Sequence, residues 1–382
     1  MKKIKVQKAK HVQLKEILIG DICKNRYAVG GKLPSEQELI RQYAVSNTTV
    51  HKALAALVHE GYIYREKGRG TFVADYKKSS RLKDKCILGF VTVFSEASHG
   101  LMFSNMLNGI SDGIQEHGYE MIFRSTGDVT EQEVQQINQL ADIVDGLVIF
   151  PSAMASTSDI VISALRKLQE RQIPFVLVDR YLNGLNCNYV VTDNFAGTYG
   201  AVEHLAKLGH KSIALFSFDD WECVTSRADR VKGYEQAVED FNVEKTLCNK
   251  AQSKILIPRK MHPNYVYERI VENIMEVGGS HSAVVTTEYY PAVGIVEAAQ
   301  RMGLNIPQDL AVIGFDEHLI PGHYPSVEIT TVIQPIYNIG RTAINILIDN
   351  VENGIKKAEG VFLKPRLVVK DSCGARLVGA LQ

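Results

Sequence analysis

The first part of the chain alternates apolar and polar residues with helical spacing, interrupted by glycine and capping residues. Residues 11–24 carry apolar side chains at largely helical intervals, which predicts an amphipathic first helix. Ser35 and Glu38 have the spacing of a capping box, so a second helix is expected to begin there. Ser46 is placed to cap a third helix. The apolar residues expected to face inward from this third helix are Val50, Leu54, Leu57 and Val58.

Two short segments after the third helix alternate like strands. They cover residues 62–66 and 71–74 and are joined by the basic, glycine-containing stretch 67–70. A hairpin of this kind after three helices predicts a winged helix-turn-helix. The two glycines of the turn would let the backbone approach a ligand closely.

From residue 86 onward the pattern changes to apolar runs separated by amphipathic helical patterns. Residues 87–94 form a continuous apolar run, as expected of a parallel strand covered on both faces. Strand and helix patterns in this alternation predict doubly wound α/β domains. Further apolar runs lie at residues 146–150, 175–178, 212–216, 283–286 and 310–314.

The charge along the chain is divided unevenly. The 382 residues contain 43 Lys and Arg and 43 Asp and Glu, but residues 1–85 hold 19 of the bases and only 8 of the acids. A basic head on an acidic body is typical of a polyanion-binding module attached to a second domain. Residues 75–85 are polar and lack apolar periodicity, which predicts a linker. We therefore expect a DNA-binding domain at 1–74, a linker at 75–85, and an effector-binding and dimerisation domain at 86–382.

Several classes of protein are disfavoured by what the sequence contains. The six cysteines form no close pair, so neither a zinc ribbon nor a Cys-x-x-Cys redox motif is expected, and no motif calls for a metal or cofactor. The N-terminus is basic, but Lys15 and Glu16 interrupt any apolar run long enough for a signal peptide. No stretch approaches the length of a membrane span. A cytoplasmic location without membrane contact is the expectation.

Polar and aromatic residues follow the apolar runs of the body at the points where each run ends. In doubly wound sheets, functional groups collect just beyond the carboxyl ends of the strands. Carboxylates and arginines can form bidentate hydrogen bonds with vicinal hydroxyls, while an aromatic ring covers an apolar C–H face. This combination predicts a sugar site. The candidates are Ser95, Asp179, Arg180, Asp193, Trp221, Glu288 and Asp316.

Structural alternatives stay open for several of these residues. Asp179 and Arg180 could form a simple ion pair, and Asp193 could cap the helix that begins near residue 194. Trp221, the one tryptophan of the chain, could pack in a core. Cys187 and Cys223 are expected to be inert thiols.

Residues 33–73 resemble the winged-helix domain of GntR-type bacterial transcription regulators, through the segments PSE, VSxxTV, AL..L...G and GxGTFV. The resemblance implies that the helix capped by Ser46 docks in the major groove, with the hairpin near the minor groove. Many relatives carry Arg where this chain has Asn47 and His51, so their base preference is not implied. Lys67 and Arg69, taken alone, would be solvated charges, but the complete motif favours DNA contact. The expected DNA-binding residues are Ser35, Arg41, Ser46, Asn47, Thr48, Thr49, His51, Lys52, Lys67, Arg69 and Gly70.

The body resembles the effector domain of LacI/GalR-type regulators, which is similar to periplasmic sugar-binding proteins. The resemblance implies two doubly wound α/β lobes around a cleft, in which Arg230 and Asp316 contact a sugar. Glu288-Tyr289 departs from the usual Asn-Asp pair, and a carboxylate accepts hydrogen bonds but cannot donate them. The segments that carry the resemblance are 174–180, 191–194, 204–210, 230–234, 306–316 and 329–335.

A GntR-type head on a LacI/GalR-type body resembles the arabinose-responsive repressors of Gram-positive bacteria. The resemblance implies a homodimeric repressor that binds operator DNA and is released by a monosaccharide, with L-arabinose the first expectation. Alternatives are an α/β enzyme acting on a sugar, a regulator that activates or uses a co-repressor, and a pure sugar-binding protein. Phosphate-loop, dinucleotide and zinc-protease motifs are missing from the sequence, which disfavours the enzyme.

Overall fold

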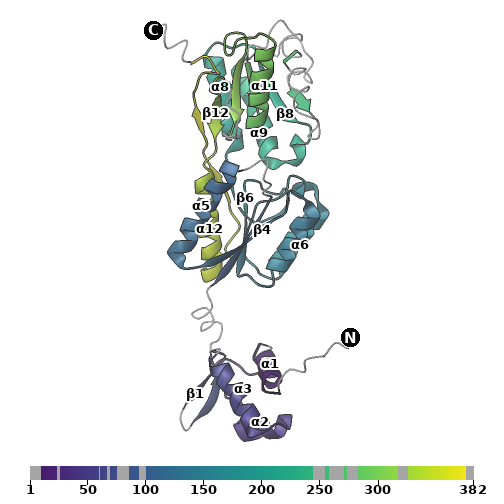
Figure 1. Cartoon of the computed structure of the whole chain (residues 1–382), viewed down its shortest axis with the longest axis vertical. Helices are drawn as coiled ribbons and strands as arrows, with labels where there is room; N and C mark the ends of the chain where they lie inside the picture. Colours follow the sequence, from purple (N-terminus) through teal and green to yellow (C-terminus); the bar gives the residue numbers. More distant parts are fainter. Residues whose placement is uncertain are drawn as a thin grey trace. The chain divides into compact units, whose positions relative to one another are not determined.

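The computed structural model describes residues 10–23, 26–59, 61–66, 69–74, 86–93, 100–243, 254–257, 271–272, 283–316 and 326–375. The chain divides into two compact units, Met1–Cys86 and Ile87–Gln382 (Figure 1). The expected linker at 75–85 and the expected contacts of Lys67 and Ser95 lie outside the described residues.

The N-terminal unit is a winged helix. Helices α1, α2 and α3 precede a two-stranded antiparallel sheet in which Ile63 pairs with Val73. Leu14, Leu18 and Leu54 belong to its fully buried core. Val58 was expected in that core but is 38% exposed, because the buried positions of its helix continue through Leu57 and turn away at the next residue. The bounds are α1 (Lys10–Cys23), α2 (Glu36–Tyr43), α3 (Asn47–His59), β1 (Ile63–Glu66) and β2 (Gly70–Val73).

The second unit contains two six-stranded sheets, each the centre of a lobe. The first lobe has the strand order β13-β7-β6-β5-β3-β4, and every pairing in it is parallel. The second lobe has the order β14-β12-β11-β10-β8-β9, parallel except for the pair formed by β12 and β14. These sheets confirm the expected doubly wound α/β architecture. The strands are β3 (Ile87–Thr92), β4 (Glu120–Ser125), β5 (Gly146–Ile149), β6 (Phe175–Val178), β7 (Asn188–Thr192), β8 (Ile213–Phe218), β9 (Lys254–Ile257), β10 (Ala283–Thr286), β11 (Ala311–Phe315), β12 (Thr330–Ile333), β13 (Gly360–Leu363) and β14 (Arg366–Val368).

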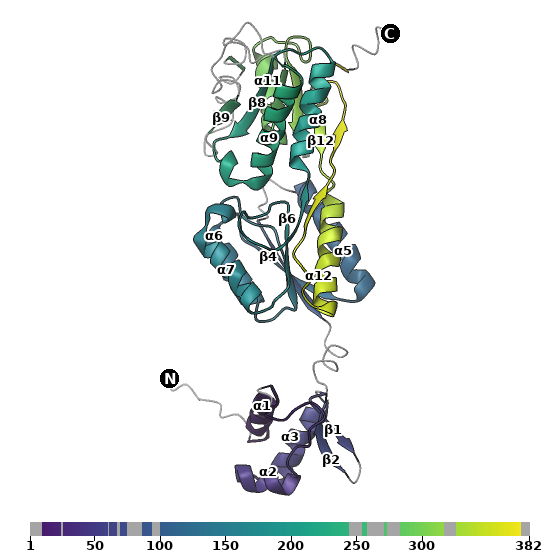
Figure 2. The same cartoon turned by 180° about the vertical axis from the view of Figure 1, so that it is seen from behind.

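Helices cover both faces of each sheet. In the first lobe α5 and α12 lie on one side and α6 and α7 on the other (Figure 2). In the second lobe α11 covers one face and α8 and α9 the other. Two short 3-10 helices, η1 and η2, precede α7 and α9. The bounds are α5 (Gly100–His117), α6 (Thr130–Leu140), η1 (Ala155–Thr157), α7 (Asp159–Glu170), α8 (Asn194–Lys207), η2 (Trp221–Cys223), α9 (Thr225–Asp240), α11 (Tyr289–Arg301) and α12 (Ile336–Asn353).

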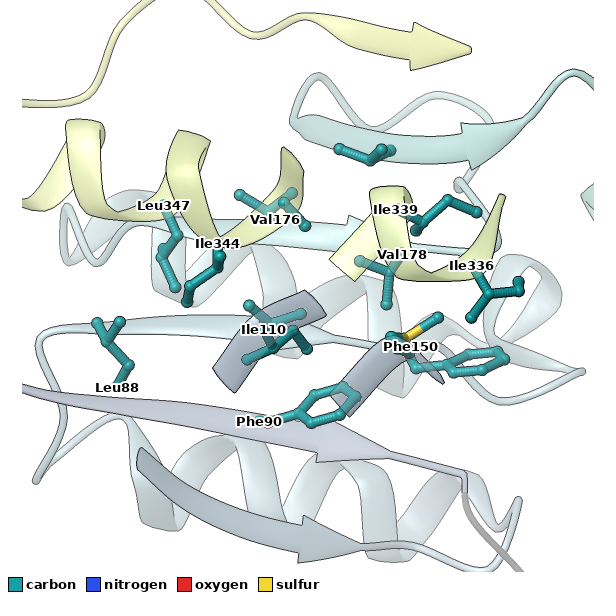
Figure 3. Packing of buried hydrophobic residues seen from close by; sticks show 14 of the residues in the cluster. Leu88, Phe90, Ile110, Phe150, Val176, Val178, Ile336, Ile339, Ile344 and Leu347 are labelled. Carbon is teal, nitrogen blue, oxygen red and sulfur yellow. The ribbon is translucent and has the colours of Figure 1, made fainter. Parts of the chain in front are cut away.

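The chain passes between the lobes after β7, after β12 and after β13, so α12 and β13 return to the first lobe. Phe90, Ile110 and Ile344 show how α12 completes this lobe, since they come from β3, α5 and α12 and meet in one buried cluster (Figure 3). Helices α5 and α12 approach very closely. A Cβ atom built on Gly340 would lie 2.3 Å from the carbonyl oxygen of Met106, which only glycine avoids.

Among the described residues, no helix combines the length and the apolar character that a membrane crossing requires.

Candidate functional site

A cavity of about 210 Å³ lies where the carboxyl ends of strands from both lobes meet. This is smaller than the roughly 300–1,000 Å³ typical of pockets for drug-sized ligands, so it suits a small molecule. Its lining is unusually rich in charged groups for its size. The first lobe supplies Met102, Phe150, Asp179 and Arg180, and the second and the crossing segments supply Phe218, Val224, Ser226, Arg227, Arg230, Glu288, Tyr290, Asp316 and Gln334.

Arg230 is the most deeply held of the charged lining residues. It projects from α9, is 4% exposed, and lies over the ring of Phe315 with its guanidinium carbon 3.7 Å from the ring centroid. Its Nε donates to Asn194 Oδ1 at 2.8 Å, and one terminal nitrogen donates to the Thr287 carbonyl at 2.6 Å. Burial lowers the pKa of Arg230, while the carboxylates of the cavity oppose that shift. The guanidinium is therefore fixed in place, and its charge is balanced by the cavity.

Arg227 lies one turn earlier on α9 and forms a buried ion cluster. Its Nε donates to Glu288 Oε1 at 2.5 Å, and Nη1 donates to Asp220. Burial acts to raise the pKa of Glu288, but the charge and hydrogen bonds of Arg227 outweigh it and leave that pKa below its usual range. Glu288 is thus held ionised, as an acceptor at the cavity wall. Sequence reasoning missed Arg227, although its spacing of three residues from Arg230 places both on one helix face.

Asp179 and Arg180 follow β6 and enter the cavity from the first lobe. Arg180 Nε lies 3.4 Å from Asp179 Oδ2, and its Nη1 donates to the Pro151 carbonyl at 3.0 Å. Asp179 has a φ of 67°, which turns the chain sharply at the end of the strand. Burial raises the pKa of Asp179, and Arg180 opposes this shift. The ion pair foreseen as an alternative is present, and both residues also line the cavity.

Asp316 stands at the end of β11, beside a segment that crosses between the lobes. Gln334 Nε2 donates to Asp316 Oδ1 at 2.6 Å. Gln334 Oε1 in turn accepts from Thr192 Oγ1 at 2.5 Å, and Thr192 ends β7. Hydrogen bonds through Gln334 therefore connect Asp316 in the cavity with Thr192, where the chain leaves the first lobe.

The aromatic rings that line the cavity are Phe150, Phe218 and Tyr290. The Arg180 guanidinium lies 5.3 Å from the Phe150 ring centroid, and that of Arg227 lies 5.0 Å from the Phe218 ring centroid. Such stacking holds cationic groups against apolar surface.

The structure places two of the expected ligand-binding residues outside the cavity lining. Asp193 is the N-cap of α8, where its side chain accepts a hydrogen bond from the Ala196 N–H at 2.9 Å. Trp221 lies in η2 and packs against the buried cluster between α8, α9 and the second sheet. These positions agree with the alternatives given for the two residues, a helix cap for Asp193 and core packing for Trp221.

The two lobes are also joined directly beside the cavity. The backbone N–H of Tyr181 donates to Thr225 Oγ1 at 3.2 Å, and that hydroxyl donates to the Tyr181 carbonyl at 2.9 Å. Ser156 donates to the carbonyl of Cys223. These contacts link the segments after β5 and β6 with the start of α9.

In the N-terminal unit, α3 presents a polar face. Ser46 caps this helix by accepting from the Thr49 N–H at 3.2 Å, and its hydroxyl lies 2.8 Å from Thr49 Oγ1. Ser35 and Glu38 form the expected capping box at the start of α2. Of the expected DNA-binding residues in this region, Thr49 is half-buried, and those with exposed side chains are Ser35, Arg41, Ser46, Asn47, Thr48, His51 and Lys52.

In the described part of the wing, Arg69 is an exposed cation and one of the expected DNA-binding residues. Arg69 is 74% exposed at its side chain and pairs with Glu66 at 2.5 Å. Gly70 has a φ of 129°, and a Cβ atom there would lie 2.6 Å from the side chain of Lys32. Lys32 forms an isolated antiparallel bridge with Phe72, so it lies beside the wing. No sequence motif drew attention to it.

Two protein-family models match the chain. Residues 10–73 match "Bacterial regulatory proteins, gntR family" and residues 202–373 match "Periplasmic binding protein-like domain". An arabinose metabolism transcriptional repressor of Geobacillus stearothermophilus is 28% identical over 371 residues, which cover 95% of this chain and 97% of that protein. A ribose operon repressor of Halalkalibacterium halodurans is 25% identical and covers 88% of this chain and 96% of that protein.

Solved structures with the same fold include the transcriptional regulator CelR in complex with cellobiose. It has a TM-score of 0.62 and 19% identity, over 86% of this chain and 91% of its own. A LacI family transcriptional regulator from Enterococcus faecium with bound ribose has a TM-score of 0.57 and 23% identity, over 75% of this chain and 98% of its own. Within the residues that the structure describes, no group of His, Cys, Asp and Glu could hold a metal ion.

Proposed function

Because the chain joins a gntR-family DNA-binding domain to a periplasmic-binding-protein-like domain, and its homologues are transcriptional repressors and not enzymes, we propose that it is a sugar-responsive repressor whose effector is a monosaccharide. The observation that carries this proposal is the cavity between the lobes. It offers fixed donors and acceptors to a small polyhydroxylated ligand, on the same chain as a helix with an exposed polar face.

The ligand chemistry follows from the groups that line the cavity. Arg180, Arg227 and Arg230 can donate hydrogen bonds, while Asp179, Glu288 and Asp316 can accept them. The hydroxyl groups of a sugar do both, so a neutral ligand fits a lining with equal numbers of each charge. Charge-assisted hydrogen bonds from such groups are stronger than those between neutral partners. Arg230 and Asp316 are proposed as the principal anchors.

L-Arabinose is the proposed effector. Two relatives named as arabinose metabolism repressors span at least 90% of this chain, at 28% and 27% identity. The volume of about 210 Å³ agrees with a single sugar ring. Glu288, held by Arg227, is a hydrogen-bond acceptor in the cavity wall, and calorimetry with several pentoses measures which of them it favours.

Operator recognition is assigned to α3 and the wing. Asn47, Thr48, Thr49 and His51 lie in the first turns of α3, where short polar groups reach base edges, and Lys52 and Arg69 supply charge for phosphates. A homodimer on a roughly palindromic operator is proposed, since two-fold protein symmetry matches symmetric half-sites. A cytoplasmic location is proposed as well, since a repressor has to reach chromosomal DNA.

Release of the operator is proposed to come from a change in the angle between the lobes. A sugar shifts this equilibrium only by its preference for one angle. Closing the cleft moves the lobes of a dimer and changes the spacing of two tethered DNA-binding domains. Two domains that no longer match their half-sites lose the advantage of simultaneous binding.

The decisive experiment measures both affinities on one preparation. Operator duplex is first selected from a random pool, and its affinity is measured by fluorescence anisotropy with and without L-arabinose. Sugar affinity is then measured by calorimetry with and without operator. Linkage requires that each ligand weaken the other by the same factor.

Four results would count against the proposal or refine it. Equal sugar affinity with and without operator rules out the coupling, and tighter sugar binding on operator indicates a co-repressor or activator. Binding of D-ribose or D-xylose in place of L-arabinose would leave the repressor function and reject the proposed effector. Chemical turnover of the bound sugar would reject a pure sensor.

A further inference from the structure

A second cavity of about 260 Å³ lies in the first lobe, at the opposite edge of the sheet from the proposed sugar site. Its lining includes Phe175 at the start of β6 and Asn188 at the start of β7. The strands of this sheet are parallel, so their starts share one edge and their ends share the other. The edge with the second cavity is also where β3 begins at Ile87, directly after the segment that leads to the N-terminal unit.

Two asparagines in this cavity are held in one orientation by their carbonyl oxygens. Asn350 Oδ1 accepts from the Lys356 N–H at 3.2 Å, and Asn188 Oδ1 accepts from the Glu359 N–H at 2.9 Å. Asn350 is 4% exposed and Asn188 is 7% exposed. Within the described part of the chain, neither Nδ2 group has a hydrogen-bond partner. Neither Nδ2 is among the described side-chain atoms that are buried without a partner, so both amide groups remain accessible in the cavity and can donate to a ligand there.

The charge of this cavity differs from that of the proposed sugar site, in which three arginines balance three carboxylates. Carboxylates line the sugar site, whereas the residues lining the second cavity include none. Lys356 is neutralised by Asp349, whose Oδ2 lies 2.6 Å from its Nζ. Lys357 also lines the cavity and forms no ion pair within the described residues. The cavity thus offers one cation and the two Nδ2 donors, beside the uncharged side-chain oxygens of Gln169 and Asn186.

The remaining wall is apolar. Ile173, Phe175 and Ile355 contribute to the lining, and Ile355 is 52% exposed. Ligand sites commonly combine apolar walls with a small number of placed polar groups. The apolar part would contact a carbon skeleton, while the donors contact oxygen atoms.

We propose that this cavity binds the oxyanion group of a small organic acid, either a carboxylate or a phosphate ester, through the amides of Asn188 and Asn350 and the ammonium of Lys357. The site is separate from the sugar cavity and is formed wholly within the first lobe. An anion bound there would lie at the edge of the lobe from which the chain continues to the DNA-binding domain.

The test uses variants that remove the donors and keep the acceptors. Asn350→Asp and Asn188→Asp retain Oδ1 for the Lys356 and Glu359 amides, but they replace each Nδ2 donor by an oxygen. Lys357→Ala removes the cation at an exposed position and keeps the test valid if an aspartate variant fails to fold. Asn138→Asp makes the same charge change on the exposed face of α6 and serves as the matched control.

Thermal unfolding of the full chain is followed against inorganic phosphate and, separately, against propionate, with ionic strength held constant by NaCl. We expect saturable stabilisation of the wild type and Asn138→Asp by at least one of the two anions. We expect Asn350→Asp and Asn188→Asp to abolish it, and Lys357→Ala to weaken the affinity about tenfold. L-Arabinose affinity, measured in parallel, should change by less than about twofold in all four variants, because the two cavities lie at opposite edges of the sheet.

Response to phosphate alone would identify a phosphate ester as the ligand class, and response to propionate alone a carboxylate. Equal anion stabilisation in the wild type and all cavity variants would overturn the proposal, as would no stabilisation by either anion at concentrations of tens of millimolar.

Discussion

The hydroxyl of Tyr181 donates to Asp229 Oδ2 at 2.9 Å, and this bond joins the first lobe to α9 of the second. Tyr181 directly follows Arg180, and Asp229 directly precedes Arg230, so the contact connects the two segments that supply cavity residues. Burial raises the pKa of the Tyr181 hydroxyl, and the Asp229 carboxylate raises it further. This hydroxyl therefore remains a donor throughout the physiological pH range.

The first prediction follows from this contact. Tyr181→Phe should weaken sugar binding about tenfold, because it removes a hydrogen bond to a charged group that joins the two lobes beside the cavity. Calorimetry with L-arabinose measures the change. Tyr199→Phe removes a hydroxyl with the same type of partner, Asp240 at 2.9 Å, but within the second lobe alone. Equal losses in the two variants would contradict a specific role for the contact between the lobes.

A second prediction concerns the anchors. Arg230→Met and Asp316→Asn should each weaken sugar binding roughly tenfold to a hundredfold, since a charge-assisted hydrogen bond contributes about 1.5–3 kcal/mol. Arg171→Met is the control, because this arginine pairs with Asp142 on the surface of the first lobe, away from the cavity lining. Sugar affinity that stays at the wild-type value in both anchor variants would show that the ligand binds elsewhere.

The third prediction concerns the DNA-binding face. His51→Ala and Thr49→Ala should change which bases are preferred, whereas Arg69→Ala should weaken binding to all sequences and reduce the salt dependence by about one charge. Lys167→Ala, on α7 of the effector-binding domain, should leave operator affinity unchanged. Binding assays at several salt concentrations separate these effects. If Arg69→Ala altered only base preference, its assignment to phosphate contact would be wrong.

Glu133 supplies a prediction about pH. Its carboxyl is fully buried on α6, and burial raises its pKa to about 7, although the Ser152 N–H donates to it at 3.1 Å and Arg180 favours its charged form. Between pH 4.5 and 7 the folded chain therefore holds a proton that the unfolded chain releases, so this group makes stability fall as pH rises. Glu133→Gln should remove that contribution, which amounts to about 3 kcal/mol at most.

The measurement for Glu133 is denaturant unfolding of wild type and variant at pH 5 and pH 8. The free energy of unfolding of Glu133→Gln, relative to that of the wild type, should increase as pH rises. Glu131→Gln, an exposed change on the same helix, should show no such trend. A difference between wild type and Glu133→Gln that is the same at both pH values would mean that the carboxyl titrates normally.

The last prediction uses the close helix pair in the first lobe. Gly340→Ala should destabilise the domain by about 1–3 kcal/mol, because the new methyl group would meet the Met106 carbonyl oxygen at 2.3 Å. Gly200→Ala offers the contrast, since nothing lies within 4 Å of its Cβ position in α8. There the better helix propensity of alanine should stabilise by up to about 1 kcal/mol. Thermal unfolding measures both effects: the Tm should fall in Gly340→Ala and rise in Gly200→Ala.

Apolar runs predicted the central strands because both faces of these strands are covered. Every position of β5, β6, β10 and β11 is buried, so the sequence there is continuously apolar. Strand β4 lies at the edge of its sheet, and most of its positions are exposed or half-buried. Its polar residues therefore gave no such run, and the same applies to β13 and β14.

Of the proposed sugar site, the sequence predicted only residues that follow the ends of recognised strands. Asp179, Arg180, Glu288 and Asp316 follow strands directly and line the cavity. Arg227 also lines it but comes from helix α9, so no strand end marks it. Gln334 directly follows β12, but that strand begins with two threonines and was not among the apolar runs recognised in the sequence. Trp221 is the opposite case. It also follows a strand, but its ring packs against the core of the second lobe and does not line the cavity, and the sequence does not reveal this orientation.

The return of α12 to the first lobe determines the order in which the protein can be completed during synthesis. Ile336, Ile339 and Ile344 belong to the same buried cluster as Phe90, which is made almost 250 residues earlier. Until α12 leaves the ribosome, the apolar face of the first sheet beside α5 lacks half of its cover. Exposed apolar surface of this kind makes an incomplete chain prone to aggregation. A nascent chain stopped before residue 336 would therefore need a chaperone for its first lobe, however complete its second lobe had become.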